Sequence, residues 1–538
     1  MKITRRQALS ALASGAIAGF APRWGLPRAW AQTPKNLPTL QYNIASGPFQ
    51  PTWESLEKTY RLPDWYRDAK FGIWMHWGPQ CQPGDGDWYA KYMYDQGRPQ
   101  YNFHLQKYGH PSKFGFKDVI NEWKAEKWDP AALMKRYKGA GAKFLVSMAN
   151  HHDNFDNFNS KYQTWNSVKI GPKKDIVGTW AKLARQNNMH FGVSVHGARA
   201  WNWYEDAQGS DKTGPLAGVP YDGKMTKADG NGLWWDGLDP QELYAQNHAL
   251  GADPDAAYVM KYFNRIKDLI DQHHPDLIFF DDPKLPLGDT GLSLAAHFYN
   301  SNRKLHNGKL SAVIVADGLS VVEQQAVTNN LERNMTLDML KTPWNKGNCL
   351  GPWHYSVADY NRGYTKTVSW IHLLVDVVSK NGTFLLAIPL PGSGEIDDKA
   401  SAFLDEMTKW MAVNSECIYN TRPWVIYGEG PSVKNDATVV DAAVNPPRGL
   451  GPMTSAADIR FTTKGNAIYA IVMGRPTGKA TIKALANNSA HDPGKIGRVQ
   501  MLGSSAKLEF TRDETGLSVT IPDAAASDYA NALKISKA

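Results

Sequence analysis

The chain has 538 residues, of which 42% are hydrophobic, so it is too long for one simple domain and too apolar to be disordered by default. Its formal net charge is +8, but residues 1–31 contribute +5 of this and the rest of the chain carries only +3. A basic surface for nucleic acid is therefore not predicted. The chain also holds 20 Trp and 23 Tyr, a content that suits stacking against sugar rings.

The first 31 residues have the pattern of a targeting segment. Thr4-Arg5-Arg6 precedes an apolar, alanine-rich run that ends at Ala21, and Ala29-Trp30-Ala31 is a small-residue cleavage site. This pattern predicts a twin-arginine signal peptide over residues 1–31, with export to the periplasm or beyond. The apolar run is too short for a membrane span, so no membrane partner is expected.

The next part of the chain alternates strands with helices. The expected strands are 71–78, 144–148 and 191–195, and the expected helices are 129–137 and 175–189. Two long loops are rich in aromatic residues. One runs from residue 79 to about residue 126, and the other spans 199–250. Loops of this length in a compact domain are usually functional, and their aromatic content argues against disorder.

The most distinctive stretch covers residues 255–281. Apolar residues recur at helical spacing from Val259 to Ile270 and predict a helix over 255–273, which Pro275 ends. The apolar run 277–280 then predicts a strand over 277–281 that is buried on both faces, as in a parallel sheet. Asp281 stands at the end of that strand.

The alternation continues with helices 292–306, 367–380 and 397–413 and strands 312–315 and 384–388. The number of units is close to that of a (β/α)8 barrel, although one or two strands are indistinct. After Trp424 only short β runs appear, at 467–472, 480–482 and 517–521. We therefore predict an α/β chain with a TIM-like barrel over 32–424, followed by an antiparallel β-sandwich domain over 425–538.

Polar side chains stand at the ends of the expected barrel strands, where such barrels carry out their chemistry: His76, His151 with His152, His196 and Asp281. Imidazoles and a carboxylate in one pocket can bind the hydroxyl groups of a sugar, and they could also bind a metal. No His-x-His or His-Glu-x-x-His pattern is present, and three isolated cysteines allow at most one disulfide and no metal cluster. The sequence thus predicts no metal and no cofactor.

Hydrolysis of a glycoside would need two carboxyl groups at this pocket. Asp281 is the first, and the second should come from a loop on the same face. Glu332 and Glu323 are the near candidates, and Asp317 is a third. Spacing alone leaves this choice open, and it equally allows Glu332 to be an exposed acid.

Several motifs, in order along the chain, resemble the α-L-fucosidases of glycoside hydrolase family 29. They are Lys70 to Ile73 with His76-Trp77-Gly78, Asp87-Trp88-Tyr89, His151-His152-Asp153, Lys173 to Val177, and Asp276 to Asp281. The resemblance runs from about residue 50 to the end of the chain, where Thr421 to Trp424 and Leu502-Gly503-Ser504 also match.

The resemblance implies a retaining exo-glycosidase with Asp281 as its nucleophile. His76, Trp88, His151 and His152 fall on residues that contact the sugar, and Leu331-Glu332-Arg333 looks like one subgroup's acid/base segment. Leu233 to Gly237 superficially resembles the nucleophile motif, but it lies in a loop without a preceding helix and is not expected to act.

The chain departs from the family pattern at positions that concern the sugar more than the reaction. Asp87 stands where the family often has Glu, and Phe279 where it often has Trp. Asp282 and Asn154 each replace a common Gly. Asp87, Phe279 and His196 are therefore expected to line the sugar pocket with the four residues above.

The main hypothesis is an exo-acting hydrolase that removes terminal α-L-fucose from oligosaccharides or glycosides with retained configuration. An α-L-glucosidase or α-L-galactosidase of the same family is the alternative, because an apolar pocket excludes an added hydroxyl only weakly. A carbohydrate-binding protein without catalysis and a metal-dependent hydrolase are the rivals from other classes.

Overall fold

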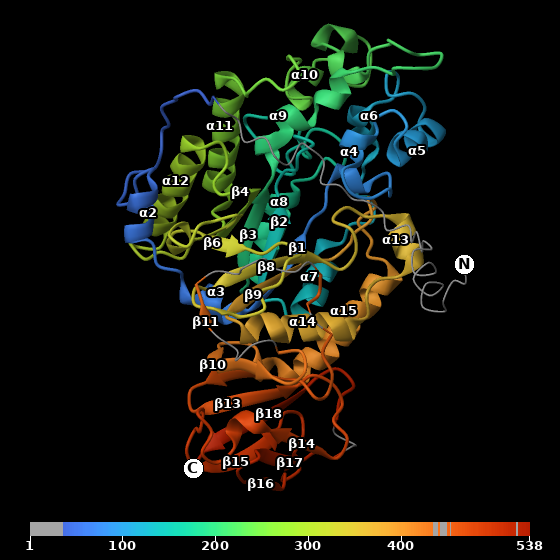
Figure 1. Ribbon diagram of the computed structural model, residues 1–538. Coiled ribbons are helices and arrows are strands. Elements are labelled where there is room, and N and C mark those ends of the chain that lie inside the picture. Colours follow the sequence, from blue (N-terminus) through green and yellow to red (C-terminus); the bar gives the residue numbers. More distant parts are fainter. Residues whose placement is uncertain (1–35, 434–438, 442–448, 452, 523–525) are drawn as a thin grey trace, which may run out of the picture. The chain divides into compact units, whose positions relative to one another are not determined.

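The computed structural model describes residues 36–433, 439–441, 449–451, 453–522 and 526–538, and Leu37–Ala538 form one compact unit (Figure 1). The expected signal peptide, residues 1–31, lies outside the described residues. Among those described, the three cysteines are free and buried, and no helix is long and apolar enough to cross a membrane.

Eight parallel strands close into a barrel in the order β1-β2-β3-β4-β5-β6-β8-β9, which confirms the predicted fold class. Their bounds are β1 Phe71–Met75, β2 Phe144–Met148, β3 His190–Val195, β4 Leu277–Pro283, β5 Val313–Asp317, β6 Thr328–Asn330, β8 Trp344–Cys349 and β9 Gly382–Ala387. β9 pairs with β1 from Phe71–Phe384 to Trp74–Ala387 and so closes the ring.

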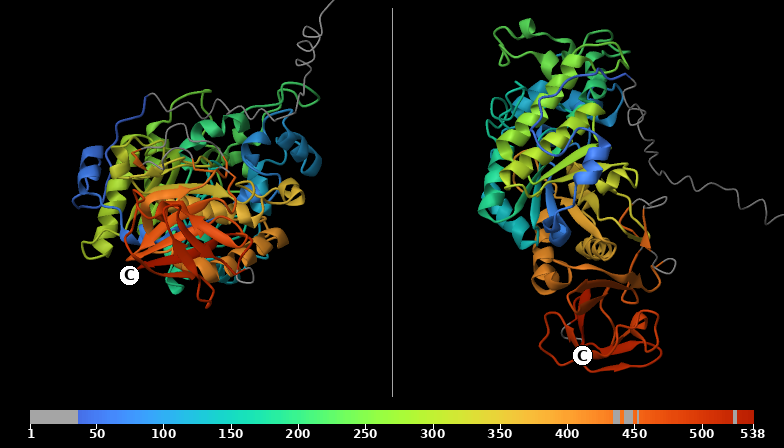
Figure 2. Two further views of the ribbon diagram at one scale, coloured as in Figure 1. Left: turned by 60° about the horizontal axis from the view of Figure 1, so that its bottom comes forward. Right: turned by 90° about the vertical axis from the view of Figure 1, so that its left-hand side faces the viewer.

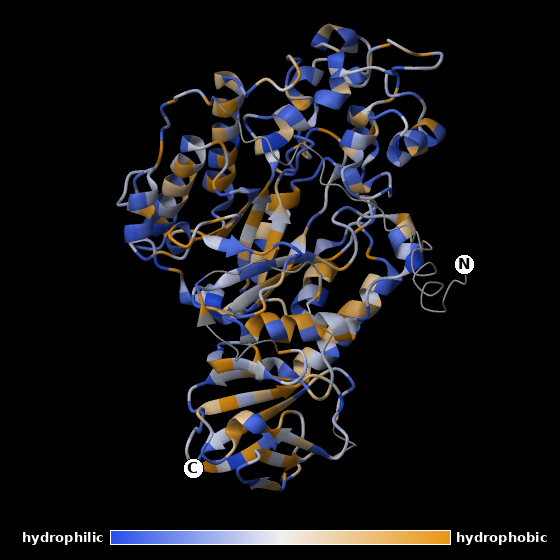
Figure 3. Cartoon of the chain, viewed as in Figure 1, coloured by the Kyte–Doolittle hydropathy of each residue, from blue (hydrophilic) through white to orange (hydrophobic). Residues whose placement is uncertain are grey.

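Helices follow most barrel strands and cover the outside of the barrel. They are α7 Pro130–Gly139, α8 Ile176–Gln186, α11 Ala256–His273, α12 Asp289–Leu305, α14 Thr367–Ser379 and α15 Asp398–Asn414. Figure 3 shows hydrophobic and hydrophilic residues interleaved along these helices, as expected when one side packs on a barrel and the other meets water. The carboxylate of Asp255 caps α11 by accepting a hydrogen bond from Tyr258 N at 2.7 Å.

Shorter helices lie in the connecting segments. They are α2 Trp53–Thr59, α3 Asp64–Ala69, α4 Tyr89–Tyr92, α5 Pro99–Lys107, α6 Phe116–Glu122, α9 Ala200–Trp203, α10 Pro240–Leu243 and α13 Val357–Arg362. Both long aromatic loops of the sequence therefore contain helical turns, and their aromatic residues are largely buried. The loops are packed parts of the barrel domain.

The two strands that the sequence does not reveal are β6 and β8. Their sequences, Thr-Asn-Asn and Trp-Asn-Lys-Gly-Asn-Cys, are polar and contain no apolar alternation. They are nevertheless almost completely buried. Their buried amides are satisfied because Asn345 Nδ2 donates to Asn330 Oδ1 at 2.7 Å and Asn330 Nδ2 donates to Asp317 Oδ1 at 2.7 Å. Hydrogen bonds between side chains replace apolar packing at this side of the barrel.

Alternate residues of β4 face different layers. Leu277 and Phe279 belong to the cluster inside the barrel, whereas Ile278 and Phe280 pack against the surrounding helices. Asp281 follows Phe280 at the end of β4, where its carboxylate meets His196 of the neighbouring strand end. The fold thus aims Asp281 at the mouth of the barrel.

The C-terminal part contains two antiparallel sheets. One has five strands in the order β10 Arg422–Glu429, β12 Ile459–Lys464, β13 Ala467–Val472, β18 Asn531–Lys537 and β15 Ile496–Met501. The other has β14 Lys479–Ile482, β17 Leu517–Thr520 and β16 Phe510–Arg512. Residues of both sheets share one apolar core, so they form a sandwich (Figure 2). β10 begins at Arg422, so the expected boundary after Trp424 falls inside this strand.

A separate pair of short strands links the barrel domain to the segment between β10 and β12 of the sandwich. β7 Met339–Leu340 pairs in parallel with β11 Val439–Val440. A buried ion pair makes a second link, in which Arg460 Nε of β12 donates to Asp376 Oδ1 of α14 at 2.7 Å.

Candidate active site

A bulge at the end of β4 sets the position of Asp281. Phe280 pairs with Ala316 of β5, but the next paired residue is Pro283, which lies opposite Asp317. Asp281 and Asp282 are therefore extra residues on β4 without partners in the ladder. Bulges of this kind re-aim side chains and occur often beside active sites.

Asp281 is held by histidines and an arginine. His196 Nδ1 donates to Asp281 Oδ2 at 2.9 Å, and His152 Nε2 lies 3.9 Å from the same oxygen. Burial opposes the ionisation of this carboxyl group, but His196, His152 and Arg199 together keep the pKa of Asp281 well below its usual value. The expected nucleophile is thus an ionised carboxylate.

His196 orients this carboxylate through a chain of hydrogen bonds. Trp74 Nε1 donates to Ser194 Oγ at 3.0 Å, which leaves the Ser194 hydroxyl able to donate to His196 Nε2 at 3.1 Å. His196 Nδ1 then carries the proton that bonds Asp281. The sequence placed His196 among the residues that line the sugar pocket, whereas here it is a buried partner of Asp281.

His151 and His152 both point into the site because β2 ends at Met148, before the pair begins. The carbonyl of His196 accepts from His152 Nδ1 at 2.6 Å, so His152 Nε2 keeps a free lone pair. Gln80 Nε2 donates to His151 Nδ1 at 3.0 Å, so His151 Nε2 carries the proton. Burial lowers the pKa of both histidines, to about 3 for His152. The pair offers one acceptor and one donor.

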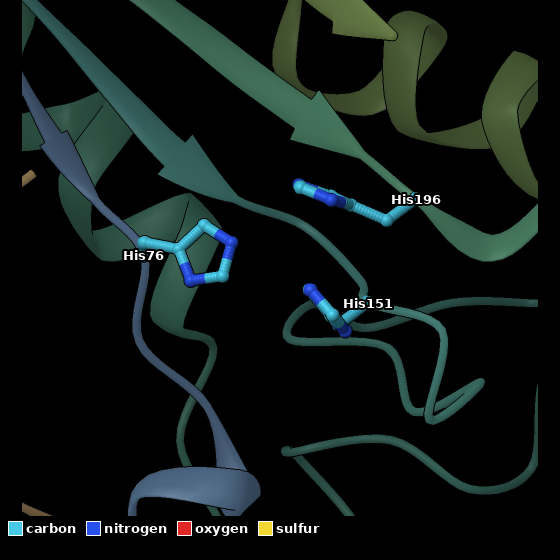
Figure 4. A group of neighbouring side chains, drawn as sticks. All are labelled: His76, His151 and His196. Carbon is cyan, nitrogen blue, oxygen red and sulfur yellow. The ribbon is translucent and has the colours of Figure 1, made fainter. Parts of the chain in front are cut away.

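The imidazoles of His76, His151 and His196 gather in one cluster, and Figure 4 shows them on three neighbouring segments that follow barrel strands. One nitrogen of each ring lies within 4.8 Å of the others, close enough to consider a metal ion. However, His151 and His196 already use ring nitrogens in hydrogen bonds with Gln80, Ser194 and Asp281. Metal binding would have to break this arrangement.

Trp88 forms an aromatic wall of the site at a conformational cost. Its backbone has φ of +61°, a left-handed conformation that bulky residues rarely adopt. Its ring lies 5.9 Å from His152 and 6.0 Å from Trp203. Strain of this kind concentrates at functional sites, where the surrounding structure maintains it.

Asp87, the residue before Trp88, lies at the same site. Its Oδ1 accepts from the backbone N of His354 at 2.7 Å, and its side chain remains 34% exposed. Burial raises the pKa of Asp87 to about 6. Asp87 is thus an acid at the sugar pocket whose charge changes near pH 6.

Two further carboxylates lie beside that of Asp281. One oxygen from each of Asp281, Asp317 and Glu332 lies within 4.8 Å of the other two. Burial, then the charges of Asp281 and Glu332, raise the pKa of Asp317 well above its usual value. Asn330 Nδ2 donates to Asp317 Oδ1 at 2.7 Å. Glu332 and Asp317 therefore both lie next to the expected nucleophile, where a second catalytic carboxyl group is required.

Glu323, the alternative acid, is engaged elsewhere. Its carboxylate accepts from Lys284 Nζ and from the backbone N of Ser320, both at 2.8 Å. Burial opposes ionisation of Glu323, but these donors lower its pKa. A carboxyl group held in its ionised form is a poor proton donor.

Two other residues considered in the sequence, Phe279 and Asp236, do not contact the pocket. Phe279 is fully buried, with its ring 4.5 Å from Trp74, so it forms the floor below the site and exposes no surface to a sugar. Asp236, of the motif that was set aside, is exposed in a loop.

The sequence did not single out Arg199 or Gln80. Arg199 Nε donates to Asp282 Oδ1 at 2.8 Å. The positions of these two residues, three after His196 and four after His76, were the only sequence signal for them.

A closed parallel barrel with two carboxylates and a wall of imidazoles at the carboxyl ends of its strands is the arrangement of a barrel glycoside hydrolase. The sequence model of the alpha-L-fucosidase family matches residues 37–416, and that of the alpha-L-fucosidase C-terminal domain matches residues 453–536. The chain therefore belongs to the alpha-L-fucosidase family of glycoside hydrolases, as its motifs predicted.

Individual relatives match over most of their length. The chain is 26% identical to an alpha-L-fucosidase of Branchiostoma floridae, over 89% of this chain and 93% of the relative. It is 25% identical to the human tissue alpha-L-fucosidase, over 88% of each. The crystal structure of Thermotoga maritima alpha-fucosidase in complex with fucose is similar with a TM-score of 0.66 and 25% identity, over 90% of this chain and all of that one.

Proposed function

We propose that this enzyme removes terminal α-L-fucose from glycans or glycosides with retained configuration, through a covalent intermediate on Asp281. The observation that carries the proposal is the placement of ionised Asp281 within 4.8 Å of a Glu332 oxygen at the mouth of the barrel. Carboxyl groups about 5–5.5 Å apart are typical of retaining glycosidases. The fucose complex of the Thermotoga maritima relative supports fucose as the sugar.

Each carboxylate has one role in the proposed reaction. Asp281 attacks the anomeric carbon while Glu332 protonates the leaving oxygen, and a fucosyl ester of Asp281 forms as the aglycone departs. Glu332 then takes a proton from a water molecule, which releases fucose with its original configuration. The hydrogen bond from His196 keeps Asp281 ionised and turned toward the sugar.

The neutral imidazoles suit the hydroxyl groups of the sugar. His151 Nε2 offers a proton and His152 Nε2 a lone pair, so the two rings distinguish a hydroxyl that accepts from one that donates. Trp88 supplies an apolar face beside them. These hydrogen bonds favour sugar hydroxyls over a metal ion as the ligand of the cluster.

Initial rates on matched 4-nitrophenyl glycosides test the substrate. We expect residues 32–538 to hydrolyse the α-L-fucoside in preference to the α-L-galactoside and α-L-glucoside, and Asp281→Ala to abolish turnover. Preference for either other sugar would keep the reaction and refute the substrate. Sensitivity to a chelator would instead support a metal-dependent hydrolase, and no turnover of any glycoside would support a binding protein.

We further propose that residues 1–31 direct export to the periplasm through a twin-arginine signal. The support is the Thr4-Arg5-Arg6 motif followed by an apolar run and a small-residue cleavage site. Arg5→Lys together with Arg6→Lys should retain the precursor in the cytoplasm, as measured by fractionation and the mass of the mature N-terminus. Export of this variant at the normal level would contradict the proposal.

A further inference from the structure

His354 is a buried residue that has no role in the proposed mechanism. It follows β8, it is fully buried, and neither Nδ1 nor Nε2 has a hydrogen-bond partner among the described residues. The nearby Nδ1 of His76 is also buried and unpartnered. A buried polar atom without a partner costs about 1–3 kcal/mol, so native structures rarely keep two on one ring without a reason.

The surroundings of His354 belong to the active site. Its ring centroid lies 4.7 Å from those of both His76 and His151, and both contacts are edge to face. On its other side, His354 Nδ1 lies 3.9 Å from Asp87 Oδ1. The missing partner of the imidazole must therefore fit between the histidine cluster and Asp87.

The distance to Asp87 is too long for a direct hydrogen bond but suits a bridged one. An oxygen atom that contacts two groups 3.9 Å apart can lie within hydrogen-bond distance of both. The side chain of Asp87 is 34% exposed while that of His354 is 1% exposed, so Asp87 is the accessible member of the pair and His354 the enclosed one. Burial lowers the pKa of His354 to about 3, which leaves a neutral ring with one donor and one acceptor.

We propose that His354 is a substrate-binding residue that, together with Asp87, holds one ring hydroxyl of the sugar. The hydroxyl oxygen accepts a hydrogen bond from the imidazole N–H, and the hydroxyl donates a hydrogen bond to the Asp87 carboxylate. This inference rests on the proposed function, because it takes a fucose-type sugar as the ligand. It makes His354 a determinant of specificity, since a sugar without that hydroxyl would leave buried polar groups unpaired.

The test compares His354→Phe with the wild type on 4-nitrophenyl α-L-fucoside and on the three analogues that each lack one ring hydroxyl. We expect kcat/KM on the parent to fall about tenfold to a hundredfold, as for the loss of a buried hydrogen bond. On one of the three analogues the two enzymes should differ by less than about twofold. His354→Gln, which keeps a donor and an acceptor, should recover part of the loss.

Thermal stability separates a binding role from a structural one. His354→Phe removes two unpaired buried nitrogens, so its Tm should equal or exceed that of the wild type. His297→Phe is the matched control, because His297 is equally buried but bonds Ala45 N and Asp271, and its Tm should fall without a change in preference among the analogues.

Equal losses of kcat/KM on all four substrates, or a lower Tm for His354→Phe, would overturn the inference. Either result would indicate that a buried water molecule is the hydrogen-bond partner of the imidazole. A wild-type enzyme without activity on the fucoside would refute the proposed function instead, so the two failures are distinguishable.

Discussion

The two carboxylates of the proposed reaction are held in contrasting ways. Asp281 stands at a bulge after an apolar strand and is fixed by side chains, chiefly His196. Glu332 lies in a turn after a polar strand and is fixed through its backbone neighbours: Leu331 N donates to Asn345 O at 2.9 Å and Arg333 N to Gly347 O at 3.1 Å. Pairing with β8 thus continues on both sides of Glu332.

The buried Lys346 completes the support of the Glu332 turn. Its Nζ donates to Asn334 O at 2.8 Å and to Leu331 O at 3.4 Å, so it stabilises the turn on both sides of Glu332. Burial lowers the pKa of Lys346 to about 7. The difference between the regions teaches that the proposed nucleophile needs fixed donors that keep it ionised, while the position of the proposed acid is set by the paired backbone of its turn.

The largest effect should come from Asp281→Asn. We expect kcat to fall by about 10⁴-fold or more, because the reaction loses its nucleophile. The matched control is Asp276→Asn at the other end of the same strand, which should retain nearly full activity in the same assay. Azide should restore turnover of Asp281→Asn and give a fucosyl azide of inverted configuration. A surviving rate near that of the wild type would remove Asp281 from the mechanism.

Glu332→Gln should come second. Loss of a general acid costs about 10²- to 10⁴-fold, and the loss should be smaller for a 4-nitrophenyl leaving group than for a sugar aglycone that needs protonation. Glu323→Gln is the control and should have little effect, since Glu323 is paired with Lys284. If Glu323→Gln proved the more damaging variant, the acid would be reassigned.

Asp87→Asn should change the pH dependence. Because burial raises the pKa of Asp87 to about 6, the carboxylate that accepts a sugar hydroxyl is lost as the pH falls below about 6. The wild-type kcat/KM should therefore fall on the acid side of pH 6, rather than near pH 4. Asp87→Asn should be about tenfold less active at neutral pH and lack this limb. An unchanged limb would assign it to another group.

Lys346→Met tests the support of the second region. The variant removes the Lys346 donor from the carbonyls of Asn334 and Leu331, of which the second keeps Asn334 N as a donor. We therefore expect a loss of about 1–3 kcal/mol in stability and a severalfold lower kcat. Lys341→Met, at an exposed lysine in the same segment, should change neither quantity. A normal kcat for Lys346→Met would show that the turn positions Glu332 without the hydrogen bonds of Lys346.

The smallest effect on activity should come from the link to the C-terminal domain. Arg460→Met leaves Asp376 buried with one partner fewer and should cost about 3–5 kcal/mol in urea unfolding, with kcat unchanged at low temperature. The exposed pair of Arg475 and Asp528 is the control, for which Arg475→Met should cost less than about 1 kcal/mol. A fall in kcat for Arg460→Met would mean that the sandwich affects the active site.

The same contrast explains what the sequence could predict. Helix α11 and strand β4 are apolar and periodic, so their positions, and Asp281 at the strand end, are readable. Strands β6 and β8 are stabilised by side-chain hydrogen bonds such as that of Asn345 to Asn330, which leave no apolar pattern. The place of Glu332 depends on the pairing of these strands, so spacing alone could not separate it from Glu323.

Strand ends predict where polar residues meet but not how they are bonded. His196 was expected at the pocket and is found there, yet its partner is Asp281 because a bulge turns that carboxylate toward it. Phe279 was expected to line the pocket and instead lies below it, since its side chain is enclosed by the barrel interior. Such details depend on register and packing, which the sequence pattern does not specify.

Trapping of the covalent intermediate tests the central claim most directly. The wild type and Glu332→Gln would be incubated with 2-deoxy-2-fluoro-α-L-fucosyl fluoride, and the labelled peptide would be identified by mass spectrometry. We predict one fucosyl adduct on Asp281, with none on Asp281→Asn. An adduct on Asp282, Asp317 or Glu332, or continued turnover with no adduct on any carboxylate, would contradict the account.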